Sequence, residues 1–241
     1  MATMSPTKTP PLSFPKSIPR GVSDNRHSNT LRSYNNKHQG KRGFLIGGGT
    51  SIVLLQQKGF DFSCLQNEVI VGVNKAYKLV LPTYLVFGDL VFWKEFYKEI
   101  QPLPCVKLAP EDIVKYHSDP GLLPLRRSNN YREVLPLGLD AAVSFINNSG
   151  VAALRILYCL GCNPIYLVGI DLGANANGDT HFHNDYTSLK RDTSKERYRC
   201  FLTEFVRTIA ALKTKDISLF SCSEISPLNA IIPYVSLTSL F

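Results

Sequence analysis

Short runs of apolar residues recur along the chain, and most of them end at a glycine or a polar residue. Apolar runs with such ends are typical of buried strands in a parallel sheet. We therefore expect strands at residues 43–46, 69–73, 83–87, 104–108, 163–170 and 216–222.

Between these runs lie segments with an apolar residue every three or four positions, a spacing that favours amphipathic helices. They predict helices at residues 52–57, 91–100 and 151–160, and a longer one near the C-terminus. Asn148 or Ser149 is expected to cap the third helix, and Thr193 with Glu196 predicts a capping box for the fourth.

The fourth helix carries Tyr198, Phe201 and Phe205 on one face, which predicts that this face packs on the sheet. Because strands and helices alternate along the chain, we predict an α/β fold with a doubly wound, mostly parallel, Rossmann-like sheet.

Two segments do not follow the alternation. Residues 109–137 contain four prolines and little periodicity, so we interpret them as an excursion and a candidate lid. Residues 1–41 are rich in Pro, Ser, Thr and Asn and have no apolar periodicity, which predicts a disordered basic tail. A nucleotide-binding catalytic domain is then expected over residues 42–241.

The net charge of +8 belongs to the tail. Residues 1–42 hold eight Lys and Arg and one Asp, whereas the rest of the chain holds 19 basic and 18 acidic residues. The folded part therefore gives no net-charge argument for a nucleic-acid groove. The tail itself fits a solvated linker, an arm for nucleic acid or an acidic partner, or an organellar transit peptide.

Composition also bears on location. No apolar run approaches the ~20 residues of a membrane helix, so no membrane span is expected. The six cysteines are scattered, and Cys159 and Cys162 have no second pair that would complete a zinc site. We interpret them as reduced, which favours the cytoplasm, or the host cytoplasm for a viral protein.

A glycine loop follows the first strand and comprises Gly47, Gly48, Gly49, Thr50 and Ser51. Backbone N–H groups at a strand–helix turn form an anion site, and glycine lets a phosphate approach the backbone closely. The loop matches neither the dinucleotide fingerprint nor the Walker A motif, so a tight strand–helix turn explains it equally well.

The strand at 163–170 leads into a histidine loop, residues 171–185, with Asp171, His181, His183 and Asp185. Imidazole titrates near neutrality, which suits a general base for an acceptor hydroxyl. The same residues also fit a hydrogen-bonded loop staple, or a divalent-metal site built from all four side chains.

Four strands end in polar or glycine-rich positions: the glycine loop, Asn74, Asp89 and the histidine loop. In a parallel sheet these ends lie along one edge, where α/β proteins bind ligands. The sequence therefore predicts a nucleotide cleft at this edge.

Six short motifs fill these positions in a recognisable order. They are Leu-Ile-Gly-Gly-Gly-Thr-Ser at 45–51, Val-Gly-Val-Asn at 71–74, Asn-Ser-Gly-Val-Ala-Ala at 148–153, Ile-Tyr-Leu-Val-Gly-Ile-Asp at 165–171, Thr-His-Phe-His at 180–183, and residues 223–229. In this order the chain resembles bacterial sialyltransferases of the GT42 type and the related DUF115 (MptE-like) proteins, which include phage-encoded members.

The resemblance implies a GT-A-like sialyltransferase variant of the Rossmann-like fold. It also implies sugar transfer from a CMP- or UDP-type nucleotide sugar to a hydroxyl acceptor, a glycan or a modified nucleobase. We assign His181, in the Thr-His position, as general base, with His183 and Asp171 in the catalytic set and no bound metal. The assigned nucleotide-binding residues are Gly47, Gly48, Gly49, Thr50, Ser51, Asn74, Asp89, Ser149, Gly150 and Tyr166.

Several positions depart from the family pattern. Thr50 stands where the family usually has proline, and Ile146 stands where the sialyltransferases carry arginine. Leu172 and Gly173 replace aromatic residues that contact the leaving phosphate, so the sequence argues against sialic acid as the donor sugar.

Two other functions stay open: a Mg/ATP-dependent diphosphokinase of the MptE type, and a non-catalytic nucleotide-binding module tethered by the tail.

Overall fold

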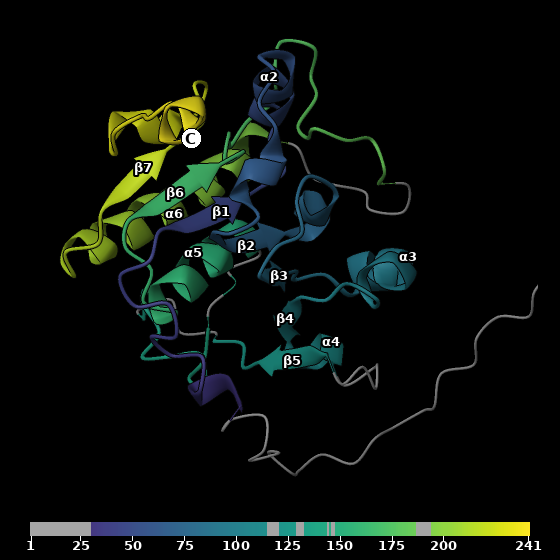
Figure 1. The fold of residues 1–241 in the computed structure, drawn as a ribbon, viewed down its shortest axis with the longest axis vertical. Helices are drawn as coiled ribbons and strands as arrows, with labels where there is room; N and C mark the ends of the chain where they lie inside the picture. Colours follow the sequence, from purple (N-terminus) through teal and green to yellow (C-terminus); the bar gives the residue numbers. More distant parts are fainter. Residues whose placement is uncertain (1–29, 115–120, 129–132, 144, 146–147, 187–193) are drawn as a thin grey trace, which may run out of the picture.

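The computed structural model describes residues 30–114, 121–128, 133–143, 145, 148–186 and 194–241. They form one sheet of seven parallel strands in the order β5-β4-β3-β2-β1-β6-β7, visible in Figure 1. The strands are β1 (Gly43–Ile46), β2 (Val69–Val73), β3 (Tyr84–Val86), β4 (Val106–Pro110), β5 (Leu122–Leu125), β6 (Ile165–Val168) and β7 (Leu219–Ser221). This order confirms the doubly wound α/β prediction.

The strand order reverses at β1. The chain runs outward from β1 to β5, then returns past β1 to form β6 and β7. Gly43 of β1 pairs with Val69 of β2 on one side and with Ile165 of β6 on the other. The carboxyl ends of β1, β2 and β6 therefore lie together at a topological switch point.

Helices cover both faces of the sheet. They are α2 (Ser51–Gln57), α3 (Leu90–Ile100), α4 (Glu111–Val114), α5 (Ser149–Cys159) and α6 (Lys195–Lys213), with the 3-10 helices η1 (Phe62–Leu65), η2 (Asn74–Lys78), η3 (Pro227–Ala230) and η4 (Leu237–Leu240). Because side chains alternate along a strand, Leu45 and Leu167 pack with α5 and α6, whereas Phe44 and Tyr166 pack with α2. None of the described helices is long and apolar enough to cross a membrane.

The N-cap of α5 is the one predicted from the sequence, whereas the N-cap of α6 lies one residue after the predicted Thr193. Asn148 is the N-cap of α5, and its side chain accepts hydrogen bonds from the Gly150 and Val151 amides, as predicted. Helix α6 is capped by Ser194, whose side chain accepts from the Arg197 amide. The Thr193 of the expected capping box lies outside the described residues.

The segment 109–137 has more regular structure than its composition suggests. It contains α4 and strand β5, which pairs with β4 and includes Pro124. Proline has no N–H for a sheet, but β5 is an edge strand, where that loss is tolerated. Residues 115–120 and 129–132 are outside the described residues, and the lid remains a prediction.

The folded part begins before residue 42. Leu31 is 3% exposed and belongs to the core cluster under α5. The Asn36 and His38 amides donate to the carbonyls of Cys159 and Leu160 at 2.8 Å each. The predicted boundary of the disordered tail is therefore too late, because residues 30–41 pack against the end of α5. Residues 1–29 lie outside the described part.

Leu31→Ala is expected to lower the free energy of unfolding by about 2–4 kcal/mol, because it leaves a cavity in the core. Urea denaturation followed by circular dichroism measures this loss. Leu137→Ala is the matched control, since the Leu137 side chain is fully exposed, and it should change the stability little. Equal stability of both variants would contradict the packing of residues 30–41 on the domain.

Candidate functional site

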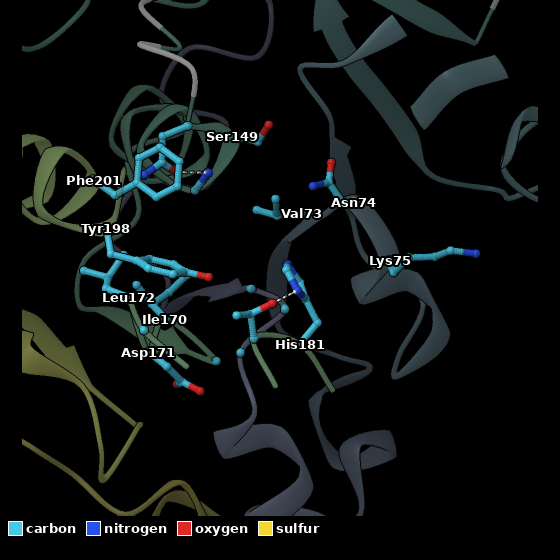
Figure 2. A pocket seen from close by; sticks show the side chains of 18 of the residues that line it. Val73, Asn74, Lys75, Ser149, Ile170, Asp171, Leu172, His181, Tyr198 and Phe201 are labelled. Atoms are coloured by element: carbon cyan, nitrogen blue, oxygen red, sulfur yellow. Dashed lines mark hydrogen bonds between the residues drawn. The ribbon is translucent and has the colours of Figure 1, made fainter. Parts of the chain in front are cut away.

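A cavity of about 400 Å³ lies at the switch point. Its wall is formed by the ends of β1, β2 and β6, the first turns of α5 and α6, and the histidine loop (Figure 2). The lining residues are 47–49, 73–75, 89, 148–150, 169–173, 180, 181, 183, 186, 197, 198, 201 and 205. Cavities of this size are typical of small-molecule and cofactor sites.

Most of the residues assigned from the sequence meet in this cavity. They are Gly47, Gly48, Gly49, Asn74, Asp89, Ser149, Gly150, Asp171, His181 and His183. Thr50, Ser51 and Tyr166 are not part of its lining. The Tyr166 ring is buried in the core between Phe44 and Phe220, with centroid separations of 5.0 and 5.3 Å.

The three glycine amides have different partners. The Gly47 amide donates to the Val168 carbonyl at 2.8 Å, and the Gly49 amide donates to the Gly169 carbonyl at 2.9 Å. Within the described part of the chain, the Gly48 amide has no hydrogen-bond partner. Among the three glycines, Gly48 therefore offers the available backbone donor.

Close packing explains two of the glycines. A Cβ atom on Gly49 would lie 2.4 Å from the Asp171 carboxylate, and one on Gly47 would lie 2.5 Å from the Gly169 carbonyl oxygen. The tightest contact of a Cβ on Gly48 would be the His181 ring, at 3.1 Å. Gly47 and Gly49 are thus required by the protein's own packing, a reason different from the phosphate approach expected from the sequence.

Asp171 holds the glycine loop through hydrogen bonds. Its side chain accepts from the Ser51 amide at 2.7 Å, the Ser51 hydroxyl at 2.6 Å and the Ser223 hydroxyl at 2.7 Å. The residue is 5% exposed, and Figure 2 shows its carboxylate turned away from the space between His181 and Tyr198. These hydrogen bonds fix the start of α2 against Asp171. They favour a positioning role for Asp171 over direct catalysis.

The histidine loop closes on the glycine loop. The Phe182 amide donates to the Gly48 carbonyl at 2.9 Å, and the neighbouring His181 ring points into the cavity in Figure 2. Nδ1 of His181 lies 2.7 Å from the Thr180 hydroxyl. Nδ1 of His183 accepts from the Asp185 amide at 3.3 Å. Each ring is therefore oriented by a neighbour in its own loop.

The proposed four-residue metal set does not converge. Asp171 is bonded to Ser51 and Ser223, whereas Asp185 forms an ion pair with Lys75 at 3.5 Å. In the described part of the chain, no group of three or more His, Cys, Asp or Glu side chains is placed to hold a metal ion. The metal interpretation of Asp171, His181, His183 and Asp185 is thus wrong.

In the described part of the chain, Asn74 and Asn148 of the cavity lining each carry a buried polar atom without a protein partner. Among the described residues, neither Oδ1 of Asn74 nor Nδ2 of Asn148 has a hydrogen-bond partner. Oδ1 of Asn148 caps α5, and Asn74 has a left-handed backbone with φ of 51°. Buried polar atoms are nearly always hydrogen-bonded in native proteins. An acceptor and a donor around one cavity therefore point to a polar ligand.

The aromatic wall was missed by the sequence reasoning. Tyr198 and Phe201 of α6 were expected to pack on the sheet, but they are half-buried and line the cavity together with the buried Phe205. Helical periodicity identifies an inward face but does not separate a core from a cavity. One sequence feature could have indicated this aromatic wall: the aromatic face begins in the first turn of the helix, with Tyr198.

A side pocket of about 110 Å³ adjoins the cavity and shares Asp89, Asn148, Ser149 and Arg197 with it. Arg127 completes its charged lining and donates to the Gly88 carbonyl at 3.3 Å. Two guanidinium groups therefore lie beside the start of α5, although neither was identified from the sequence. The pocket is large enough for one small polar group.

No protein-family model matches the sequence, and a search of curated proteins finds no match. Among solved structures, the Maf glycosyltransferase from Magnetospirillum magneticum AMB-1 is similar with a TM-score of 0.52 and 14% identity, over 93% of this chain and 40% of that chain. The sialyltransferase CstII from Campylobacter jejuni, in complex with CMP-3FNeuAc, has a TM-score of 0.48 and 17% identity, over 80% of this chain and 86% of that chain. The α-2,3-sialyltransferase Cst-I from the same organism has a TM-score of 0.47 and 16% identity, over 92% and 84%. The chain thus shares the α/β fold of the Maf glycosyltransferase and spans less than half of its length.

Proposed function

We propose that this chain is a glycosyltransferase that moves a sugar from a nucleotide-sugar donor to an acceptor hydroxyl, with His181 as general base. The observation that carries the proposal is the His181 ring in the switch-point cavity, directly beside Gly48. The resemblance of the motifs to GT42-type sialyltransferases and the fold shared with the Maf glycosyltransferase support it.

The donor binds between the glycine loop and α5 in this proposal. The Gly48 amide and the positive end of the α5 dipole attract the phosphate. Oδ1 of Asn74 and Nδ2 of Asn148 gain hydrogen-bond partners from the ligand. Tyr198 and Phe201 provide flat apolar surface for the base or the sugar ring.

His181 accepts the proton of the acceptor hydroxyl. At the same time, the hydroxyl oxygen bonds to the anomeric carbon of the sugar. The bond between that carbon and the phosphate oxygen breaks, and the leaving phosphate keeps the electron pair. N–H donors already in place stabilise this charge, which lowers the barrier. Thr180 orients the imidazole by its 2.7 Å contact with Nδ1.

The finer assignments belong to the same proposal. The donor is of the CMP or UDP type, and the acceptor is a glycan or a modified nucleobase. The basic tail would contact nucleic acid in the second case, and the reaction would take place in the cytoplasm. Any magnesium would be bound by the donor phosphates, because the four side chains of the candidate metal set in the histidine loop do not converge.

A thermal-shift screen with CMP, UDP, GDP, ADP and ATP, with and without EDTA, tests the proposal. We expect one nucleoside mono- or diphosphate to stabilise the protein in EDTA, by about 2.7 kcal/mol at a hundredfold excess over its Kd. Asn74→Ala should weaken this shift, whereas Asn184→Ala, at an exposed position outside the cavity lining, should retain it. A shift with ATP alone that EDTA removes would indicate the diphosphokinase instead. No shift with any nucleotide would contradict the cavity assignment.

A further inference from the structure

A lysine cluster next to the cavity connects the histidine loop to the rest of the fold. It consists of Lys75, Tyr77 and Lys78 from η2, Glu99 from α3, and Asp185 from the histidine loop. The family motifs include none of these residues. Figure 2 shows the Lys75 side chain extending away from the cavity, so the ammonium group faces the cluster and not the nucleotide site.

Lys75 is the buried member of the cluster. Its side chain is 1% exposed, and its ammonium nitrogen lies 3.5 Å from both the Glu99 and the Asp185 carboxylates. The nitrogen also donates to the Tyr77 hydroxyl at 3.2 Å and lies 3.4 Å from the centre of the Phe96 ring. Burial lowers the pKa of Lys75, and the two carboxylates oppose that shift. A buried ammonium group is costly without such partners. Loss of a contact with Lys75 should therefore cost more free energy than loss of an ordinary surface ion pair.

Lys78 reinforces the same two carboxylates from the surface. Its ammonium nitrogen lies 3.2 Å from Asp185 and 3.4 Å from Glu99. The hydrogen bond from Lys78, with the charge of Lys75 beside it, holds the pKa of Asp185 below its ordinary value. Asp185 is therefore fixed in its ionised form between two cations.

Asp185 contacts His183, and its neighbour Tyr186 contacts both histidines. Its amide donates to Nδ1 of His183, whose ring packs against Tyr186 with a centroid separation of 4.5 Å. Tyr186 also contacts the His181 ring at 5.5 Å and the Phe96 ring at 6.0 Å. The hydrogen bond from Phe182 to Gly48 fixes the other side of His181. The loop is thus attached at the glycine loop through Phe182 and at the lysine cluster through Asp185, with His183 between these contacts and His181 directly before Phe182.

We propose that Lys75 and Lys78 are positioning residues that hold His181 and His183 at the cavity through their ion pairs with Asp185. Lys75 directly follows Asn74 in η2, so the residue proposed to contact the nucleotide and the attachment of the histidine loop share one short segment. The catalytic part of this inference rests on the proposed general base. The attachment of the loop does not.

Asp185→Asn and Glu99→Gln form a matched pair for the test. Each variant removes one charge next to Lys75 and Lys78, but only Asp185 belongs to the histidine loop. Both carboxylates are partly exposed at 38% and 45%, so neither substitution threatens the core. Hydrogen exchange of the ligand-free protein, followed by mass spectrometry of peptides covering residues 180–186, reports on the loop without any substrate.

We expect Asp185→Asn to speed exchange of these peptides about tenfold or more, with Glu99→Gln within about twofold of the unchanged protein. Added salt should enhance exchange in the unchanged protein and little in Asp185→Asn. Equal exchange in the two variants would overturn the proposal, because the cluster would then act only as local packing. This result is independent of whether the chain transfers sugars.

A nucleotide sugar built on the nucleotide found in the thermal-shift screen supplies the donor for the second readout. Asp185→Asn should lower kcat about tenfold with little change in the KM for that donor, whereas Glu99→Gln should leave both within about twofold. Faster exchange with unchanged kcat would refute the catalytic part alone, and would leave the loop attachment standing.

Discussion

His181→Ala is expected to lower kcat by about 100- to 10,000-fold, the range that a positioned general base contributes. The donor Kd should change by no more than about threefold, because the phosphate contacts are assigned to Gly48 and α5. The imidazole lies in the cavity beside Gly48, and Thr180 orients its Nδ1 at 2.7 Å. Steady-state kinetics give kcat, and isothermal titration with the nucleotide gives Kd.

His183→Ala is the control variant, because it shows whether the loss of kcat is specific to His181. Nδ1 of His183 accepts from the Asp185 amide, and its ring packs against Tyr186. We therefore expect a smaller loss of kcat, about tenfold, through looser placement of His181. Equal losses in both variants would argue against a single base. Full activity of His181→Ala would refute the base and favour a binding module.

The strand-end rule assembled most of the cavity from the sequence. Asn74, Asp89 and the histidine loop are far apart in the chain, yet parallel strands bring their ends to one edge. Apolar runs predict such strands because both faces of the sheet are buried. Tyr166, which was assigned to the nucleotide through the resemblance, lies inside β6 and packs in the core, because alternation along a strand decides which face a side chain takes.

Features decided by distant partners were not predictable. The burial of Leu31 depends on the core under α5, and the partners of Asp171 come from residues 51 and 223. The lysine cluster joins η2, α3 and the histidine loop, which no local pattern relates. Local periodicity carries information about helices and strands, whereas these contacts depend on how the elements pack.

Gly49→Ala and Asp171→Ala are each expected to lower the free energy of unfolding by about 3 kcal/mol, for opposite reasons. The alanine Cβ would lie 2.4 Å from the Asp171 carboxylate and must displace a buried, hydrogen-bonded group. Loss of that carboxylate leaves the Ser51 and Ser223 hydroxyls without their buried acceptor. Urea denaturation at pH 7 measures both losses, and Gly173→Ala is a mild control because its nearest contact is 3.9 Å.

The double variant separates these two causes. Without the Asp171 carboxylate, the Cβ at position 49 has room, so Gly49→Ala should destabilise the Asp171→Ala protein much less than the unchanged protein. The expected coupling is about 1–3 kcal/mol, as for residues in direct contact. Additive losses would mean that the Asp171 carboxylate is not what excludes a side chain at position 49, and that Asp171 does not set the geometry of the glycine loop. A strong coupling would make Asp171 the residue that fixes the glycine loop, because the carboxylate then fits only against a glycine at position 49.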